Sequence, residues 1–273
     1  MKISGKTKIT GLFGYPVEHS LSPAMHNAAF EVIGLDYRYV AFPVHPNFLK
    51  EAVGAIRALN LAGVNVTIPH KEKVITFLDE IDKEASIIGA VNTIVNSEGV
   101  LKGYNTDGRG FMQSLFECGI SVEGKDVLIV GAGGASRALS YYLCKEAKKV
   151  YLYDIEKNKA SKLVEDFDNI FGNIFTLENI SNIDKFNILI NATPLGLREE
   201  DPLPLDTTML RQDQIVCDLI YKNTPLLKEA AKKGCLILNG LGMLLWQGVF
   251  AFELWTGVTP PVDIMRDALY KNV

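Results

Sequence analysis

The chain has 273 residues, a length at which one hydrophobic core commonly divides into two. Its composition, 48% hydrophobic and 22% charged, is that of an ordinary soluble globular protein. A formal net charge of -4 at pH 7 argues against a nucleic-acid-binding surface and against a polybasic membrane patch.

Cysteine spacing and apolar segments narrow the class of protein further. The cysteines lie far apart without a CxxC pair, which indicates neither a zinc site nor a disulfide framework: Cys118, Cys144, Cys217 and Cys235. The most apolar stretch, residues 240–255, is interrupted by Gln247 and Glu253 and falls short of a membrane span. The first residues, MKISGKTKITG, lack the features of a signal peptide. We therefore expect a cytoplasmic protein that binds no metal, membrane or nucleic acid.

The first hundred residues alternate between strand and helix periodicities. Strands are expected where apolar residues alternate or cluster, at residues 8–14, 37–44, 63–68 and 92–96. Helices are expected where apolar residues recur at helical spacing, at residues 23–33, 47–59 and 72–81. This alternation predicts an α/β domain with a mostly parallel sheet covered by helices.

Residues 99–110, GVLKGYNTDGRG, are rich in glycine and polar side chains, which is typical of a junction between domains. A second alternation follows, with strands expected at residues 126–130, 150–153, 187–191, 215–219 and 235–238. Helices are expected up to about residue 146 and at residues 158–167, 226–232, 244–255 and 262–270. Because the last two helices could pack back on the first domain, we expect one domain from residues 1–105 with 241–273, and another from residues 106–240.

The segment DVLIVGAGGASRA predicts a dinucleotide-binding turn. Its apolar strand suits the centre of a parallel sheet and leads into Gly131, Gly133 and Gly134, with Ser136 where glycine or alanine is usual. Gly131 permits a tight turn, Gly133 lets the backbone approach a pyrophosphate, and the next helix offers free N–H groups to that anion. A glycine turn alone is a weak signal. With the strand before it, the helix after it and Asp154 ending the next strand, it predicts a Rossmann-type domain.

Asp154 bears on the choice of cofactor. A carboxylate at the end of the second strand accepts hydrogen bonds from a ribose 2′-OH and repels a 2′-phosphate. Ile155 and Glu156 offer no guanidinium for that phosphate, whereas Lys157 and Lys159 could help to bind it. A solvated Asp in a turn is the alternative interpretation.

Lys71, in VNVTIPHKEKV, lies at the carboxyl end of a predicted strand, where open α/β sheets usually bind ligands. A dinucleotide domain beside a separate α/β domain suggests hydride transfer, which needs a proton donor near the substrate oxygen. Lys71, His19 or His70 could supply that proton, although each could equally be a solvated surface residue.

Other polar residues occupy positions suited to a ligand. Ser20 and Ser22 precede a helix that starts at Pro23, where they could bind a carboxylate or simply cap the helix. Further candidates lie at strand ends, in the glycine-rich junction and on the first tail helix: Asn92, Asp107, Asn191, Tyr221 and Gln247.

Taken in order, these motifs resemble those of the shikimate dehydrogenase family over nearly the whole chain: GYPVEHSLSP, NVTIPHK, GAVNT, YNTDGRG, NATPLG, DLIY and GLGMLLWQG. The family reduces 3-dehydroshikimate to shikimate in aromatic amino-acid biosynthesis. The resemblance implies that Lys71 is catalytic and that Asp107 is its paired acid.

The same resemblance implies residues that bind substrate and cofactor. At the substrate carboxylate it implies Ser20, Ser22 and Tyr221, and at the ring hydroxyls Thr67, Asn92 and Gln247. At the cofactor it implies the glycine turn, with two further positions lining the nicotinamide: Gly131, Ala132, Gly133, Gly134 and Ala135, then Leu219 and Gly240.

One segment departs from the family pattern. Members that use NADP typically carry NRTxxKA after the second strand of the cofactor domain, whereas this chain has DIEKNKA at residues 154–160. Ile155 replaces the Arg that would bind the 2′-phosphate, and Glu156 replaces the Thr. We therefore predict that NAD is used at least as well as NADP.

Other functions remain open from the sequence. A quinate/shikimate dehydrogenase that prefers NAD would also contain the SLSP serines. A folate-type methylene dehydrogenase would have no need of those serines, and a non-catalytic dinucleotide-binding regulatory module would leave Lys71, Asn92 and Asp107 without a purpose. The protein could be a monomer or a homodimer.

Overall fold

The computed structural model describes residues 3–272, which form two compact units. Unit 1 comprises Met1–Gly110 with Leu244–Val273, and unit 2 comprises Phe111–Met243. Both divisions fall inside helices, α4 (Asp107–Glu117) and α8 (Leu241–Thr256), a few residues after the boundaries expected from the sequence.

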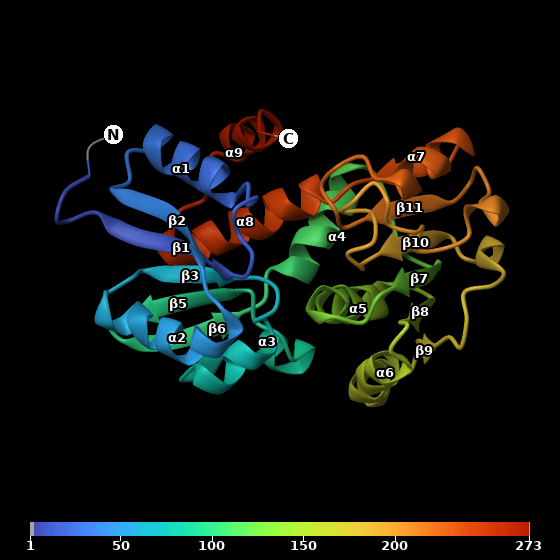
Figure 1. The fold of residues 1–273 in the computed structure, drawn as a ribbon, viewed down its shortest axis with the longest axis horizontal. Helices are drawn as coiled ribbons and strands as arrows, with labels where there is room; N and C mark the ends of the chain where they lie inside the picture. The colour runs from blue at the N-terminus through green and yellow to red at the C-terminus, as the bar shows by residue number, and fades with distance from the viewer. Residues whose placement is uncertain (1–2, 273) are drawn as a thin grey trace. The chain divides into compact units, whose positions relative to one another are not determined.

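Unit 1 contains a six-stranded sheet in the order β2-β1-β3-β5-β6-β4 (Figure 1). Its strands are β1 (Lys8–Gly14), β2 (Tyr37–Pro43), β3 (Gly63–Val66), β4 (Glu80–Ile81), β5 (Thr93–Ser97) and β6 (Val100–Tyr104). β1 pairs in parallel with β2 and β3, and β4 with β6, whereas β5 is antiparallel to both of its neighbours. The α/β class and the mostly parallel sheet are confirmed.

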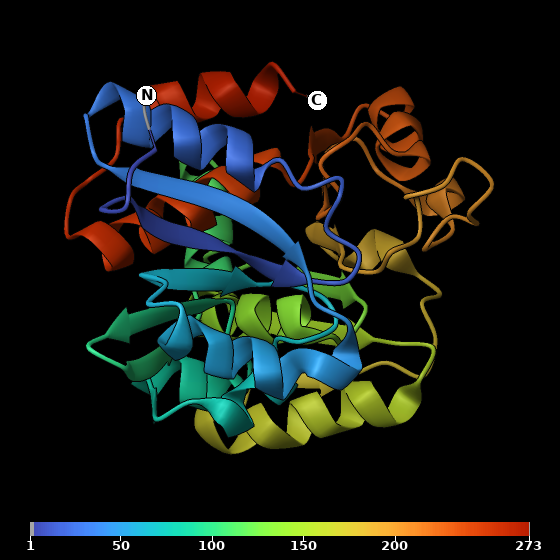
Figure 2. The same cartoon turned by 60° about the vertical axis from the view of Figure 1, so that its left-hand side comes forward.

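Helices cover both faces of this sheet. α2 (Leu49–Ala58) packs its apolar stripe against one face, beside Val64 and Val66 of β3. α1 (Ser22–Val32) and α8 pack together through aromatic rings on the opposite face. α9 (Val262–Tyr270) lies beside α1 in both views (Figures 1 and 2), so the C-terminal helices return to unit 1. Within residues 3–272, none of the helices is long and apolar enough to cross a membrane.

Residues 72–81 do not form the helix that their apolar spacing predicts. They form a short 3-10 helix, η2 (Lys73–Phe77), followed by the edge strand β4. The N–H groups of Asp79 and Asp82 donate to the carbonyls of Leu101 and Gly103 in β6, at 3.0 and 2.8 Å. Pairing with the sheet therefore replaces the helical hydrogen bonds, although the same apolar side chains stay packed on the core.

The glycine-rich segment 99–110 is also more regular than expected. It forms β6 and the first turn of α4, and a Cβ at Gly103 would lie 2.6 Å from Leu78 Cδ1, so this glycine permits close packing in a strand. The helix predicted at residues 47–59 begins as the 3-10 helix η1 (Pro46–Phe48) and continues as α2, whereas the short helix α3 (Lys83–Ile88) was not predicted.

Unit 2 contains a six-stranded sheet in the order β12-β11-β10-β7-β8-β9, with every neighbouring pair parallel. Its strands are β7 (Asp126–Val130), β8 (Lys149–Tyr153), β9 (Ile174–Thr176), β10 (Ile188–Asn191), β11 (Ile215–Asp218) and β12 (Leu236–Leu238). Its helices are α5 (Gly134–Glu146), α6 (Lys157–Phe171), α7 (Pro225–Lys232), η3 (Ile183–Lys185) and η4 (Thr207–Met209).

The order of these strands is that of a Rossmann-type domain, which confirms the prediction. Chain order reverses between the adjacent strands β7 and β10, so their carboxyl ends form the switch point at which open α/β sheets bind ligands. All four apolar residues of β7 are buried, as a central parallel strand requires. The glycine turn begins directly after β7.

Candidate active site

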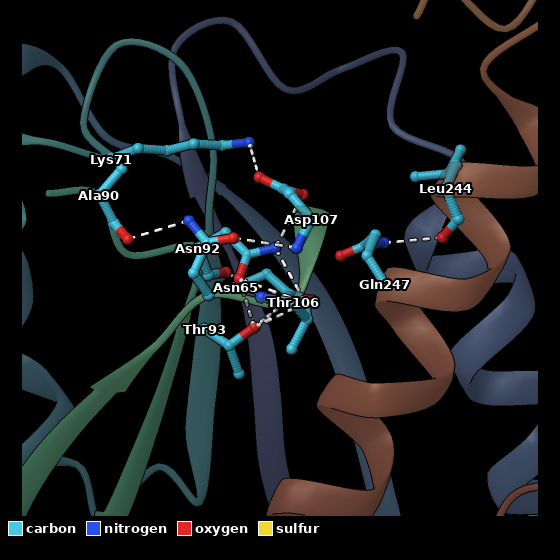
Figure 3. Close-up of polar contacts among 10 residues, drawn as sticks. Asn65, Lys71, Ala90, Asn92, Thr93, Thr106, Asp107, Leu244 and Gln247 are labelled. Atoms are coloured by element: carbon cyan, nitrogen blue, oxygen red, sulfur yellow. Dashed lines mark hydrogen bonds and ion pairs between the residues drawn. The ribbon is translucent and has the colours of Figure 1, made fainter. Parts of the chain in front are cut away.

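Lys71 and Asp107 form an ion pair in unit 1 (Figure 3). Lys71 Nζ lies 2.6 Å from Asp107 Oδ2, and the two side chains are 15% and 5% exposed. Lys71 follows β3 through a short turn, and Asp107 is the first residue of α4. Residues 36 positions apart in the chain are thus brought together where water is scarce.

The turn before Lys71 is held from both sides. Thr67 donates its N–H to Phe13 O at 2.8 Å, and its own carbonyl accepts the N–H of His70 at 2.9 Å. The buried His70 ring places Nε2 2.7 Å from Val44 O, and because a carbonyl only accepts, Nε2 carries the proton. His70 therefore anchors the turn, so its ring is engaged in a structural bond, while His19 is exposed.

Asn92 orients the carboxylate of Asp107. Its Nδ2 donates to Asp107 Oδ1 at 2.9 Å, and its Oδ1 accepts the N–H of Thr106 at 2.8 Å. Asn105 Oδ1 accepts the N–H of Asp107 at 3.0 Å, which fixes the start of α4. Each oxygen of Asp107 thus has its own donor, Lys71 for one and Asn92 for the other (Figure 3).

Three buried polar residues beside this pair were missed from the sequence. The Tyr39 hydroxyl donates to Asn65 Oδ1 at 2.8 Å, and Asn65 Nδ2 donates to Thr93 Oγ1 at 3.0 Å. The Thr93 hydroxyl donates to Asn92 Oδ1 at 3.0 Å. One signal could have revealed them, since Asn65 interrupts the apolar run of β3 and a buried amide needs partners.

The other predicted substrate residues of unit 1 lie on separate segments. Ser22 is buried at the first position of α1, and Ser20 Oγ accepts its N–H at 3.3 Å, so Ser20 serves the helix start as well. Thr67 is half-buried in the turn before Lys71. Gln247 of α8 donates its Nε2 to Leu244 O at 2.8 Å, and its side-chain oxygen points toward Asp107 (Figure 3).

In unit 2 the glycine turn lies at the switch point. Gly131 has a φ of 104°, in the region that glycine favours, and an added Cβ would lie 2.9 Å from Ala192 O. Gly133 is exposed, precedes α5, and has nothing within 4 Å of where a Cβ would stand. Gly134 and Ala135 are the first residues of α5, next to the unfilled space at Gly133. Their N–H groups, at the start of the helix, fit an anionic pyrophosphate.

Asp154 connects the end of β8 to this turn. Its Oδ2 accepts the N–H of Ala132 at 2.7 Å, and its Oδ1 accepts the N–H of Glu156 at 2.8 Å. Ile155, at the position of the Arg in the NADP pattern, is 88% exposed. The end of β8 thus presents a carboxylate and an apolar side chain.

The two lysines near Asp154 are paired with carboxylates of the same unit. Lys157 pairs with Glu178, and Lys159 pairs with Glu156. The pKa of Lys157 is raised and that of Glu178 lowered, in each case chiefly by the hydrogen bond between them. The positive charges of Lys157 and Lys159 are therefore partly neutralised by these carboxylates, which weakens their attraction for a 2′-phosphate.

The loop after β11 approaches the segment before α8. Gly240 donates its N–H to Ile220 O at 3.0 Å, and a Cβ at Gly240 would lie 2.1 Å from Leu219 O. The structure thus brings the predicted nicotinamide-lining residues Leu219 and Gly240 together, and only glycine fits at 240. Tyr221 is half-buried in the same loop, and burial raises the pKa of its hydroxyl.

Comparison with known proteins identifies the family. The model of the shikimate dehydrogenase substrate binding domain matches residues 12–94, and that of the shikimate 5'-dehydrogenase C-terminal domain matches residues 240–270. The shikimate dehydrogenase (NADP(+)) of Desulforamulus reducens is 47% identical, covering 100% of this chain and 98% of that protein. The chain belongs to the shikimate dehydrogenase family.

Solved structures of shikimate dehydrogenases share the fold. The crystal structure of the Aquifex aeolicus protein matches with a TM-score of 0.93 at 42% identity, covering 98% of this chain and 99% of that chain. The Listeria monocytogenes protein, solved in complex with shikimate and NAD, matches with a TM-score of 0.88 at 40% identity and 98% coverage of both chains. The family resemblance seen in the motifs is therefore confirmed along the whole chain.

Proposed function

We propose that this protein catalyses reversible hydride transfer between a nicotinamide cofactor and 3-dehydroshikimate or shikimate, a step of aromatic amino-acid biosynthesis. The observation that carries the proposal is the Lys71–Asp107 pair at 2.6 Å. Reduction of a carbonyl requires an acid beside the oxygen, and a buried ammonium with a fixed carboxylate meets that requirement. Family membership supports the same substrate class.

The acid–base step is assigned to Lys71. As the carbonyl is reduced, negative charge develops on its oxygen, and the ammonium stabilises that charge and delivers a proton. In the opposite direction the neutral amine removes the proton from the hydroxyl. Asp107 orients the ammonium through one oxygen while Asn92 holds the other. A bound nicotinamide would accept or supply the hydride.

Positioning of the ring is assigned to the remaining polar residues. Ser20 and Ser22 would hold the substrate carboxylate, which decides which ring carbon is presented for reaction. Hydroxyls of the ring would bond Thr67, Asn92 and Gln247. Tyr221 is also assigned to the substrate carboxylate, and this assignment rests on the family motif alone.

The cofactor is NAD or NADP, and we propose that NAD serves at least as well. The glycine turn supports a pyrophosphate, and Asp154 supports a free ribose 2′-OH rather than a phosphate. The Desulforamulus reducens relative is named for NADP, whereas the Listeria monocytogenes structure contains NAD. We therefore base the preference on this chain's own residues at the end of β8.

Quinate, which carries one more ring hydroxyl, is the second candidate substrate. The observation that favours quinate is the end of β8, where Asp154 fits NAD better than NADP.

A non-catalytic regulatory module is disfavoured because it gives the buried Lys71–Asp107 pair no role. From composition and cysteine usage we expect a cytoplasmic protein, and its oligomeric state is left as a monomer or a homodimer.

An assay of shikimate and quinate oxidation, each with NAD and with NADP, tests the proposal. Absorbance of the reduced nicotinamide gives the rates, and shikimate should be oxidised with a kcat/KM for NAD at least equal to that for NADP. No turnover of shikimate would refute the assigned activity. A preference for NADP of tenfold or more, about 1.4 kcal/mol, would refute only the cofactor assignment.

A further inference from the structure

The ring of Tyr39 lies in the apolar core of unit 1 while its hydroxyl reaches the polar network of the candidate site. Tyr39 is 2% exposed, and its ring stacks on His26 with centroids 4.4 Å apart and an interplanar angle of 9°. The ring of Trp255 also packs against it, at 5.9 Å. Because close packing fixes the ring, the hydroxyl is held at one position.

From this hydroxyl a chain of hydrogen bonds runs in one direction to Asp107. Tyr39 donates to Asn65 Oδ1, and Asn65 Nδ2 donates to Thr93 Oγ1. The Thr93 hydroxyl then donates to Asn92 Oδ1, and Asn92 Nδ2 donates to Asp107 Oδ1 (Figure 3). An amide has an acceptor on one side and donors on the other. The donor at Tyr39 therefore favours the orientation of Asn65 in which its Nδ2 also donates to Asn92 O, at 3.2 Å, while the N–H of Thr106 favours the same sense for Asn92.

The same hydroxyl also meets Ser22. Burial raises the pKa of Tyr39, and a hydrogen bond with Ser22 opposes that rise. Because the single proton of the Tyr39 hydroxyl is donated to Asn65, Ser22 is the donor of this bond and Tyr39 the acceptor. Tyr39 is thus in contact with a residue assigned to the substrate carboxylate and, through the chain, with the carboxylate that holds Lys71.

We propose that Tyr39 is a positioning residue for the reaction, acting on Ser22 directly and on Asp107 through Asn65, Thr93 and Asn92. This inference rests on the proposed function. Without the hydroxyl, Asn65 Oδ1 loses its donor, and Asn65, which donates to Thr93 Oγ1 and to Asn92 O, holds these two neighbours of Asp107 less firmly. The orientation of Lys71 and of the substrate carboxylate should then loosen together.

Replacing Tyr39 with Phe tests the proposal, with Tyr37→Phe as the matched control. Tyr37 lies two residues earlier in β2, is 9% exposed, and stacks on Phe30 at 5.2 Å. Y39F should lower kcat for shikimate by about tenfold, the loss expected for one buried hydrogen bond, and raise its KM several-fold. The KM of the cofactor should not change, and Y37F should behave as the unmodified protein.

A second variant, Thr93→Val, cuts the same chain nearer to Asp107 with almost no change of shape. It should lower kcat as Y39F does, and the double variant should be no worse than the poorer single one, because both changes interrupt one chain. If Y39F does not fold, the kcat of T93V tests whether this chain of hydrogen bonds supports the reaction.

Three results would overturn this inference alone: unmodified kinetics in the folded variants, fully additive losses in the double variant, or an equal loss in Y37F. Failure of the unmodified protein to oxidise shikimate would instead overturn the proposed function, and this inference with it.

Discussion

Lys71 and Asp107 depend on each other because both charges are largely removed from water. Replacing one leaves the other buried and unpaired, which typically costs about 3–5 kcal/mol. Asn92 reduces that dependence for Asp107, since it donates to the oxygen that Lys71 does not contact. Loss of activity in a variant of either residue therefore has to be separated from loss of stability, and urea unfolding of the same variant makes that separation.

At the end of β8, individual side chains should decide the choice of cofactor. Replacing Ile155 with Arg and Glu156 with Thr provides a guanidinium for a 2′-phosphate and removes one of the competing carboxylates. We expect kcat/KM for NADP, relative to that for NAD, to rise by at least about tenfold, because hydrogen bonds to a charged group contribute about 1.5–3 kcal/mol.

The control for this change is Ile170→Arg with Glu165→Thr, which makes the same change of net charge on α6, away from the end of β8, at two exposed sites. It should leave the cofactor preference as it was. An equal shift in both variants would show that net charge, and not the position of the Arg, controls the preference.

Among the elements of unit 1, α4 and α8 come into backbone contact at Gly110. A Cβ there would lie 2.6 Å from the backbone nitrogen of Gln247, which is assigned to a ring hydroxyl. Gly110→Ala should therefore push the two helices apart, destabilise the protein by about 1–3 kcal/mol and raise the KM for shikimate. Urea unfolding and steady-state kinetics measure the two effects.

Gly54→Ala is the matched control, because Gly54 lies inside α2 with nothing within 4 Å of the added Cβ. It should stabilise the protein by about 0.5–1 kcal/mol and leave the KM unchanged. If G110A behaved like G54A, the contact between the helices would not position Gln247.

How far the elements follow from the sequence depends on their apolar pattern. Residues 126–130 form a strand as expected, because a continuous apolar run fits a strand buried on both faces. The prediction of a helix at residues 72–81 was wrong because η2 and β4 bury the same side chains that a helix would bury. Only the hydrogen bonds to β6 distinguish a strand from a helix in this segment. The contact between Tyr39 and Asn65 depends on the order of β2, β1 and β3, which no local pattern specifies.

At the scale of the whole molecule, pH should act on stability through the core of unit 1. His26 is fully buried, neither ring nitrogen has a hydrogen-bond partner within the described residues, and burial lowers its pKa from 6.5 to about 3. Between these values the unfolded chain binds a proton that the folded chain does not. The stabilisation is thus complete above about pH 6.5 and is lost as the pH falls toward 3, by up to about 1.4 kcal/mol per pH unit.

His26→Phe should remove this dependence. The variant keeps an aromatic ring to stack on Tyr39 and buries no unpaired nitrogen, so its stability should fall less steeply than that of the unmodified protein between pH 6.5 and pH 5. Urea midpoints measured across that range provide the comparison. Parallel slopes for the two proteins would mean that other groups cause the acid sensitivity.

Lys71→Ala tests most directly whether the ammonium held by Asp107 delivers the proton. The kcat and KM for shikimate are measured at saturating cofactor, with circular dichroism to confirm that the variant is folded. We predict that kcat falls by about 10²–10⁴-fold, the usual contribution of a positioned acid, while the KM changes little. A variant with intact kcat and a raised KM would contradict the account, because Lys71 would then only bind the substrate.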